Sequence, residues 1–177
     1  RSDESGTTEN FQECLAAVAP SVWTYEVDGN WPVKGGESAQ GTSGVVDAIG
    51  AGEGSIGYAD ASQVGDLGVA TVKVGANFVG PTAEAAAKIL DESPRSSVGG
   101  KNVFTYDLKR DTASEGVYPI ALPSYAMACT QSDPADTAAL VKGYLSYMIS
   151  PEGQQTAADS AGSAPLTESL RTLIQPS

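Results

Sequence analysis

Short β-rich runs alternate with segments of helical periodicity along this chain of 177 residues. The runs predicted as strands are residues 55–58, 69–74, 103–108 and 125–129. The predicted helices begin near residues 7, 41, 82, 133, 150 and 167. Strands interspersed with helices are typical of the α/β class, in which helices cover a sheet. Twenty glycines and ten prolines supply the many turns that such an alternation needs.

The first predicted helix has one apolar stripe. The residues at i, i+3, i+4 and i+7 of that stripe are Phe11, Cys14, Leu15 and Val18. This spacing predicts an amphipathic helix whose stripe faces the core. Thr7 is the predicted N-cap, and Pro20 ends the helix.

The most regular helical pattern begins at Asp133 and Pro134, since proline suits the first helical turn. Its predicted buried face consists of Leu140, Val141, Tyr144, Leu145 and Met148. Before this helix, residues 117–122 are predicted to cross over in an extended conformation. Helix starts are also predicted at Thr82, Ser150 and Thr167, whose hydroxyls suit an N-cap.

The chain is strongly acidic, with a formal net charge of −12 and a pI near 4.2. Nucleic acids and anionic membranes are recognised by basic stripes, so this charge excludes them as partners. A small anion is not excluded, because local N–H groups and one guanidinium can hold it. Distant carboxylates are screened over about 8 Å at physiological salt.

The sequence contains no histidine and two cysteines, Cys14 and Cys129. Catalytic triads that need histidine, and metal sites with histidine ligands, are therefore excluded. The cysteines lie far apart and form no CxxC motif, so we expect no zinc or redox site. Both are predicted to be buried apolar positions, although one disulfide could form in an oxidising compartment. Because the chain begins at Arg1 rather than methionine, we expect a processed or truncated piece.

The opening residues combine the groups that a tetrahedral oxyanion needs. Arg1 can offer a bidentate fork to two oxygens, and Asp3 can orient that fork. Ser5 and Thr7 offer hydroxyls, and Gly6 lets the backbone approach a ligand. The free N–H groups of a first helical turn also attract an anion. A simple capped helix start would use the same Ser-Gly-Thr segment, and this interpretation stays open.

Other candidate groups favour structural roles. The segment 41–44 is either an anion nest or a simple N-cap, and the acidic cluster Asp133–Asp136 supplies charge to a helix start. Tyr58 and Tyr118 are predicted to pack or to line a hinge rather than to bind a ligand. Trp23 and Trp31 are expected to cover the surface. Asp107 and Asp111 form no metal-loop pattern.

The opening motif Arg-Ser-Asp-Glu-Ser-Gly-Thr resembles the R-[SA]-D-x-S-G-T motif of PstS-type proteins, the phosphate-specific substrate-binding proteins of ABC transporters. The actinobacterial members are the most similar. Further segments resemble this family in the same order along the chain, namely residues 44–48, 54–58, 118–120 with Tyr125, 138–142, 153–155 and 164–166. The resemblance therefore covers nearly the whole chain.

The resemblance implies that Arg1, Ser5, Gly6 and Thr7 bind phosphate and that Asp3 pairs with Arg1. In this family a further aspartate from the N-terminal lobe accepts the proton of the phosphate and rejects sulfate. That lobe is missing here, so the chain departs from the complete pattern. The implied fold is a partial, type II-like periplasmic-binding-protein fold. Residues 1–116 would form the second lobe, incomplete at its N-terminus, and residues 117–177 would cross back to the first lobe.

The implied function is capture of inorganic phosphate outside the cytoplasm and its delivery to a membrane permease, without catalysis, cofactor or metal. We expect a cell-surface location with a lipid anchor on the complete protein, and self-association of the truncated chain. Three alternatives stay open. The ligand could be sulfate or molybdate, the scaffold could carry a phosphatase-like activity, or the chain could be a structural or adhesive surface fragment.

Overall fold

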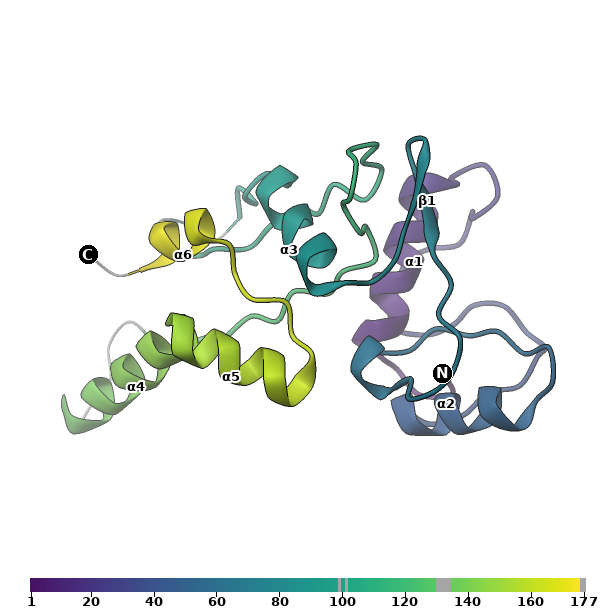
Figure 1. The fold of residues 1–177 in the computed structure, drawn as a ribbon, viewed down its shortest axis with the longest axis horizontal. Helices are drawn as coiled ribbons and strands as arrows, with labels where there is room; N and C mark the ends of the chain where they lie inside the picture. The colour runs from purple at the N-terminus through teal and green to yellow at the C-terminus, as the bar shows by residue number, and fades with distance from the viewer. Residues whose placement is uncertain (99, 101, 130–134, 176–177) are drawn as a thin grey trace.

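The fold was taken from a computed structural model, which describes residues 1–98, 100, 102–129 and 135–175 (Figure 1). Its elements are α1 (Gly6–Val18), α2 (Gly41–Ala51), the 3-10 turn η1 (Ala61–Gln63), β1 (Val72–Val74), β2 (Asn77–Val79), α3 (Ala83–Glu92), α4 (Ala135–Met148), α5 (Pro151–Ala161) and α6 (Glu168–Ile174). The mixture of helix and strand agrees with the predicted α/β class. Among the described residues, however, the strands form a single two-stranded hairpin rather than a larger sheet.

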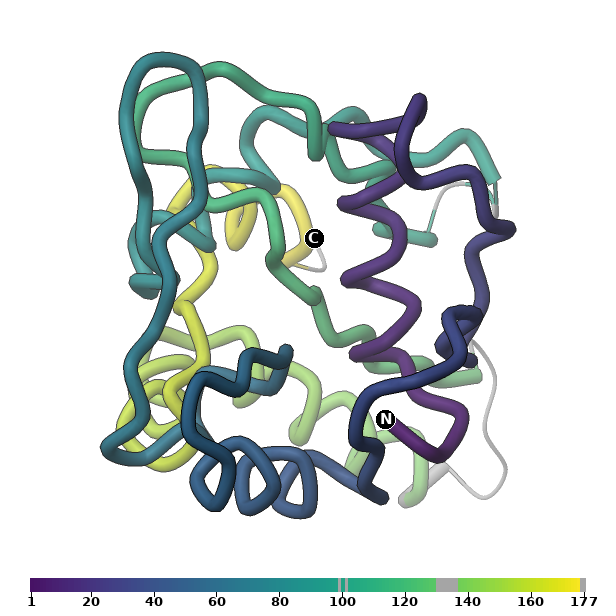
Figure 2. The backbone as a smooth tube through the Cα atoms, turned by 90° about the vertical axis from the view of Figure 1, so that its right-hand side faces the viewer, coloured from purple at the N-terminus to yellow at the C-terminus, as the bar shows by residue number. Residues whose placement is uncertain are grey.

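The elements spread along the longest axis of the molecule. Figure 1 shows α1, α2 and the hairpin on one side, α3 between the two sides, and α4, α5 and α6 on the other. The N-terminus lies beside α2, and the C-terminus lies at the opposite end. In the perpendicular view of Figure 2, α1 runs from top to bottom on the side away from the hairpin. The first helix and the start of α2 therefore meet at the N-terminus, where the candidate motif lies.

A small apolar core joins the hairpin to α3. Val74, Val79 and Ala85 are buried together, with Tyr118 packed against them. The Tyr118 N–H donates to the carbonyl oxygen of Ala85 at 2.9 Å, so the segment after Gly116 is held on α3. The prediction that Tyr118 is a packing residue is confirmed, and burial raises the pKa of its hydroxyl.

The hairpin was only half predicted. Of the predicted strand 69–74, residues 72–74 form β1, and β2 was missed. The two strands pair antiparallel around Gly75 and Ala76, and Gly75 has a φ of +58°. Glycine tolerates this conformation at the first position of a two-residue turn. The Gly-Ala pair between the β-prone triplets Val-Lys-Val and Asn-Phe-Val is the signal that could have revealed β2.

Three predicted strands were wrong. Residues 55–58 and 125–129 have no strand pairing, and within 103–108 only Tyr106 forms an isolated bridge, with Arg95. A strand needs a neighbour to satisfy its backbone groups, and no described strand lies beside these segments. Segment 125–129 is also exposed rather than buried, with Met127 96% exposed.

The buried face of α1 is mainly polar. Thr8, Asn10 and Gln12 are buried with Cys14, whereas Val18 of the predicted apolar stripe is 54% exposed. Gln12 explains part of this pattern, because its side-chain amide donates to the carbonyl oxygens of Asp28 and Asn30, both at 2.8 Å. These bonds tie the loop after α1 back onto the helix. Periodicity therefore identified Cys14 and Phe11 as packed residues, but it missed the buried polar residues and was wrong for Val18.

Arg110 connects α1 to the segment that leads away from the hairpin core. Its guanidinium is buried and donates to Asn10 Oδ1 at 2.7 Å and to the carbonyl oxygen of Pro119 at 3.0 Å. It also forms an ion pair with Glu13. A guanidinium that is ion-paired and hydrogen-bonded at both terminal nitrogens is one of the few cations that a protein interior tolerates.

Several helix predictions hold and others fail. Thr82, Ser150 and Thr167 are N-caps, and each accepts a backbone N–H of its helix. The predicted buried face of α4 is wrong, since Leu140 and Tyr144 are 75% and 64% exposed. The predicted start of this helix at Asp133 and Pro134, and the acidic cluster that begins there, lie outside the described residues.

The two cysteines are both free. Cys14 is buried as predicted, and burial raises the pKa of its thiol. Cys129 is exposed, so the prediction that it is buried was wrong. Its position within the exposed segment 125–129 is the reason, because that segment has no strand beside it among the described residues.

The Arg110 network yields a stability prediction. Arg110→Ala should lower the free energy of unfolding by about 3 kcal/mol, because it leaves Asn10 and a buried carbonyl without their donor. Glu13→Gln should cost less than about 1 kcal/mol, since the Glu13 side chain is 47% exposed. Urea unfolding followed by circular dichroism measures both. Equal losses in the two variants would contradict a role for the buried guanidinium as a connector.

Candidate functional site

The first turn of α1 opens toward solvent at Gly6. Ser5, not the predicted Thr7, is the N-cap, and its Oγ accepts the Thr7 N–H at 3.1 Å. Ser5 takes this role because its backbone is extended, with φ −154° and ψ 131°, while Thr7 is already helical. The N–H groups of Gly6 and Thr8 have no hydrogen-bond partner among the described residues. Gly6 is exposed, so its N–H is open to an anion, whereas Thr8 is fully buried.

Gly6 leaves this helix end uncovered. A Cβ built at residue 6 would meet no atom within 4 Å, and the residue is exposed. Packing within the described chain therefore does not require glycine there. Close approach of a ligand to the backbone is a reason that remains.

Arg1 and Asp3 form a bidentate ion pair, as predicted. Arg1 Nε donates to Asp3 Oδ1 at 2.8 Å, and Arg1 Nη2 donates to Asp3 Oδ2 at 2.5 Å. The side chain of Arg1 is only 12% exposed. These two bonds fix the orientation of the guanidinium through its Nε and Nη2 atoms.

The start of α2 meets this ion pair. The Gly41 N–H donates to Asp3 Oδ1 at 3.1 Å, and Arg1 Nη1 donates to Thr42 Oγ1 at 3.4 Å. The N-cap of α2 is Gln40, whose side chain makes no capping bond. The carboxylate of Asp3 takes that place, so the segment 41–44 begins a helix that is capped from another part of the chain.

Hydrogen bonds determine the charge of Asp3. The Arg1 side chain, then the Gly41 N–H, hold the pKa of the Asp3 carboxyl well below its usual range. The same pairing raises the pKa of Arg1. The ion pair is therefore fully charged under all ordinary conditions.

Tyr58 joins the two parts of the motif, and its predicted packing role is confirmed by its ring contacts. Its hydroxyl lies 2.9 Å from Thr8 Oγ1 and 3.4 Å from the backbone nitrogen of Arg1. Its ring stacks on Phe11, with centroids 4.7 Å apart. Among the described residues no direct hydrogen bond joins Arg1 to Ser5, Gly6 or Thr7, so Tyr58 is the link between them.

Aromatic rings extend from Tyr58 toward the surface. The ring of Trp31 lies 5.5 Å from Tyr58, and Trp23 lies 5.0 Å from Trp31. The two tryptophans therefore pack together over Phe11 of α1, and both are half-buried. The Gly-Ser-Ile-Gly-Tyr segment could have indicated the position of Tyr58, since Gly57 passes so close to α2 that a Cβ would lie 2.7 Å from Ile49 Cδ1.

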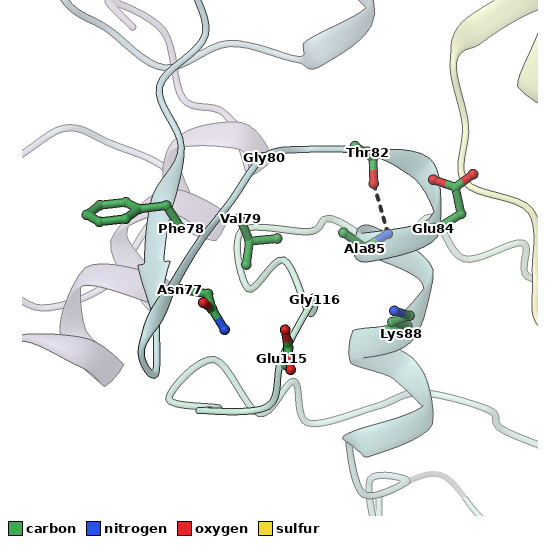
Figure 3. A pocket seen from close by; sticks show the side chains of 10 residues that line it. All are labelled: Asn77, Phe78, Val79, Gly80, Thr82, Glu84, Ala85, Lys88, Glu115 and Gly116. Atoms are coloured by element: carbon green, nitrogen blue, oxygen red, sulfur yellow. Dashed lines mark hydrogen bonds between the residues drawn. The ribbon is translucent and has the colours of Figure 1, made fainter.

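An open hollow elsewhere contains none of the predicted site residues. It lies between β2, the first turns of α3 and residues 115–116, and Figure 3 shows Glu84, Lys88 and Glu115 around it. Within the described part of the chain, no group of three histidine, cysteine, aspartate or glutamate residues is placed to hold a metal ion. None of the described helices has the length and apolar character that crossing a bilayer requires.

The sequence of this chain also matches a known protein family. A family model described as PBP superfamily domain matches residues 1–152. The chain belongs to this superfamily. The predicted fold class is confirmed at this level, while the assignment of lobes is not decided by the match. No solved structure matches the chain significantly.

Curated relatives carry the predicted resemblance. The chain is 30% identical over 182 residues to the phosphate-binding protein PstS 3 of Mycobacterium leprae. It is 32% identical over 184 residues to the phosphate-binding protein PstS2 of Mycobacterium bovis. Each alignment covers 98% of this chain and 48% of the relative, so the chain spans about half the length of these relatives. The resemblance to PstS-type proteins is confirmed.

The pKa of Asp3 leads to a prediction about acid. A carboxyl whose folded pKa lies below its unfolded value stabilises the fold above that unfolded value, about 3.9. This contribution should be complete above about pH 5 and should be lost as the pH falls through the lower, folded pKa. Carbon-13 NMR of the Asp3 carboxyl checks the titration, and Asp3→Asn should remove the effect. Titration of Asp3 at its ordinary value would contradict the described pairing.

Proposed function

We propose that this chain carries one side of a binding site for inorganic phosphate. The observation that carries the proposal is the Arg1 guanidinium, which Asp3 holds, near the open first turn of α1. Tyr58 links the amino nitrogen of Arg1 to Thr8 in that turn. Ser5, Gly6 and Thr7 would contact the anion with Arg1, and Asp3 would hold the fork in place. These groups supply charge-assisted and backbone hydrogen bonds, which are the strong interactions available to an oxyanion.

The similar relatives are named as phosphate-binding proteins, which supports the same ligand here. We further propose that the complete protein captures phosphate outside the cytoplasm, with a lipid anchor at the cell surface, and delivers it to the permease of an ABC transporter. Closure of two lobes would exclude water from the hydrogen bonds and raise affinity. This function needs no catalysis and no cofactor.

The large surface of the chain supports a two-lobed complete protein. The chain exposes 11629 Å². A compact monomer of 18.0 kDa is expected to expose about 8,000 Å². The excess has the size of a permanent protein interface. In our proposal residues 1–116 belong to the phosphate-binding lobe and residues 117–177 return to the other lobe. The missing part of that fold would cover the unpaired segments 55–58 and 125–129.

The alternatives have less support. Sulfate or molybdate would fit the same fork, since all are tetrahedral oxyanions. A phosphatase-like activity would need a nucleophile with a base, and the chain contains no histidine to serve Ser5. A structural or adhesive role would not explain why the open start of α1 lies beside a guanidinium of fixed orientation. Hydrolysis of p-nitrophenyl phosphate at high protein concentration would reveal a phosphatase-like activity.

Loss of the guanidinium should abolish binding. In the complete two-lobed protein, Arg1→Ala should remove detectable phosphate binding, and Arg1→Lys should weaken it at least about tenfold, because an ammonium cannot form the fork. Isothermal titration calorimetry measures both variants. In the same protein arsenate should compete with phosphate and sulfate should not. Unchanged affinity in Arg1→Ala would refute the site, and competition by sulfate alone would refute the ligand.

The exposed apolar side chains should make the chain self-associate. Leu140 and Tyr144 lie one turn apart on α4 and are largely exposed. Leu140→Gln combined with Tyr144→Gln should shift the chain toward monomer, because it removes apolar surface that a second chain would cover. Sedimentation velocity over a concentration series measures the shift, with Ser146→Gln on the same helix as control. A wild-type chain that stays monomeric throughout would contradict this prediction.

A further inference from the structure

We propose that Thr42, at the start of α2, positions the Arg1 guanidinium for the oxyanion and belongs to the site with Asp3 and Gly41. This inference rests on the proposed phosphate function and adds a residue outside the opening motif. Thr42 is 39 or more positions from Arg1 and Asp3 in the sequence, and its hydroxyl accepts Arg1 Nη1 at 3.4 Å. The sequence pattern alone indicated only a nest or a cap for segment 41–44.

The donors of Arg1 can be counted. A guanidinium has five N–H groups. Asp3 takes one from Nε and one from Nη2, and Thr42 takes one from Nη1. Within the described residues this leaves one N–H on each terminal nitrogen. Two such groups can bind two oxygens of one phosphate, so three internal bonds orient the guanidinium and two donors stay available.

Capping does not explain the orientation of the Thr42 hydroxyl. Gln40 is the N-cap of α2, and Thr42 is the second residue within the helix. No described backbone N–H donates to Thr42 Oγ1, whereas Arg1 Nη1 does. Because the oxygen accepts from Arg1, its own hydroxyl hydrogen is directed elsewhere. Among the described residues it has no acceptor, so it can point to an oxyanion held by Arg1.

The backbone around Thr42 is fixed to the motif. The Gly41 N–H donates to Asp3 Oδ1 at 3.1 Å, and the Ser2 N–H donates to the carbonyl oxygen of Ala39 at 3.0 Å. Segments 1–3 and 39–42 are therefore held against each other by side-chain and backbone bonds. Because Thr42 lies on this fixed backbone, its hydroxyl can restrict the motion of the Arg1 guanidinium. This lowers the entropic cost of ordering the Arg1 side chain when the anion binds.

The experiment compares Thr42→Val, Thr42→Ser and Ser43→Ala in the 177-residue chain. Phosphorus-31 NMR titration gives the affinity for inorganic phosphate. The hydrogen-exchange rate of the Arg1 Nε–H reports how well the guanidinium is held in its orientation. Thr42→Val keeps the shape but removes the acceptor, so it should weaken phosphate binding about tenfold and make Nε–H exchange several-fold faster. Thr42→Ser should restore both values. The neighbouring Ser43 is exposed, and its removal should change neither.

The outcomes separate this inference from the proposed function. Unchanged affinity and exchange in Thr42→Val would overturn the positioning role, as would a failure of Thr42→Ser to restore them. An equal loss in Ser43→Ala would assign the effect to α2 as a whole and would also overturn it. If the wild-type chain shows no phosphate binding, the proposed function fails in this chain. The exchange of the Arg1 Nε–H alone then decides whether Thr42 positions the fork.

Discussion

The polar buried face of α1 is the constraint on which the rest of the structure depends. A buried polar group without a partner is costly, and every buried polar residue of this face has at least one hydrogen bond, although Gln12 Oε1 itself has none. Thr8 pairs with Tyr58, Asn10 with Arg110, and Gln12 with the carbonyl groups of the loop that follows the helix. Three distant segments are thereby attached to one helix. The first turn of that helix is held beside Arg1 as a result, which is what makes an anion site geometrically feasible.

The net charge of −12 and a phosphate ligand are compatible because the site is local. Asp3 does not repel the anion from the fork as an isolated carboxylate would, since its charge is engaged by Arg1 and by the Gly41 N–H. The guanidinium keeps two N–H groups that no described residue accepts. Carboxylates farther away are screened by salt, so they act on solubility more than on binding.

Local signals were predictive where neighbouring residues decide the structure. Thr82, Ser150 and Thr167 cap their helices as expected, because a hydroxyl and the N–H two or three residues later are enough. Predictions failed where burial depends on distant partners. Leu140 of α4 is exposed, and segment 125–129 has no strand beside it among the described residues. Periodicity can identify an apolar face, but only a packed neighbour can bury it.

The sequence by itself determined the pairing of Arg1 with Asp3 and the superfamily, because these depend on residues close together and in a recognisable order. Only the tertiary structure decided that Ser5 caps α1 and that Tyr58 and Thr42 adjoin the motif. Those two side chains come from positions about 40 and 57 residues away, counted from Arg1. Spacing along a chain cannot specify such contacts, since they arise from the way segments 1–3, 39–42 and Tyr58 come together in the fold.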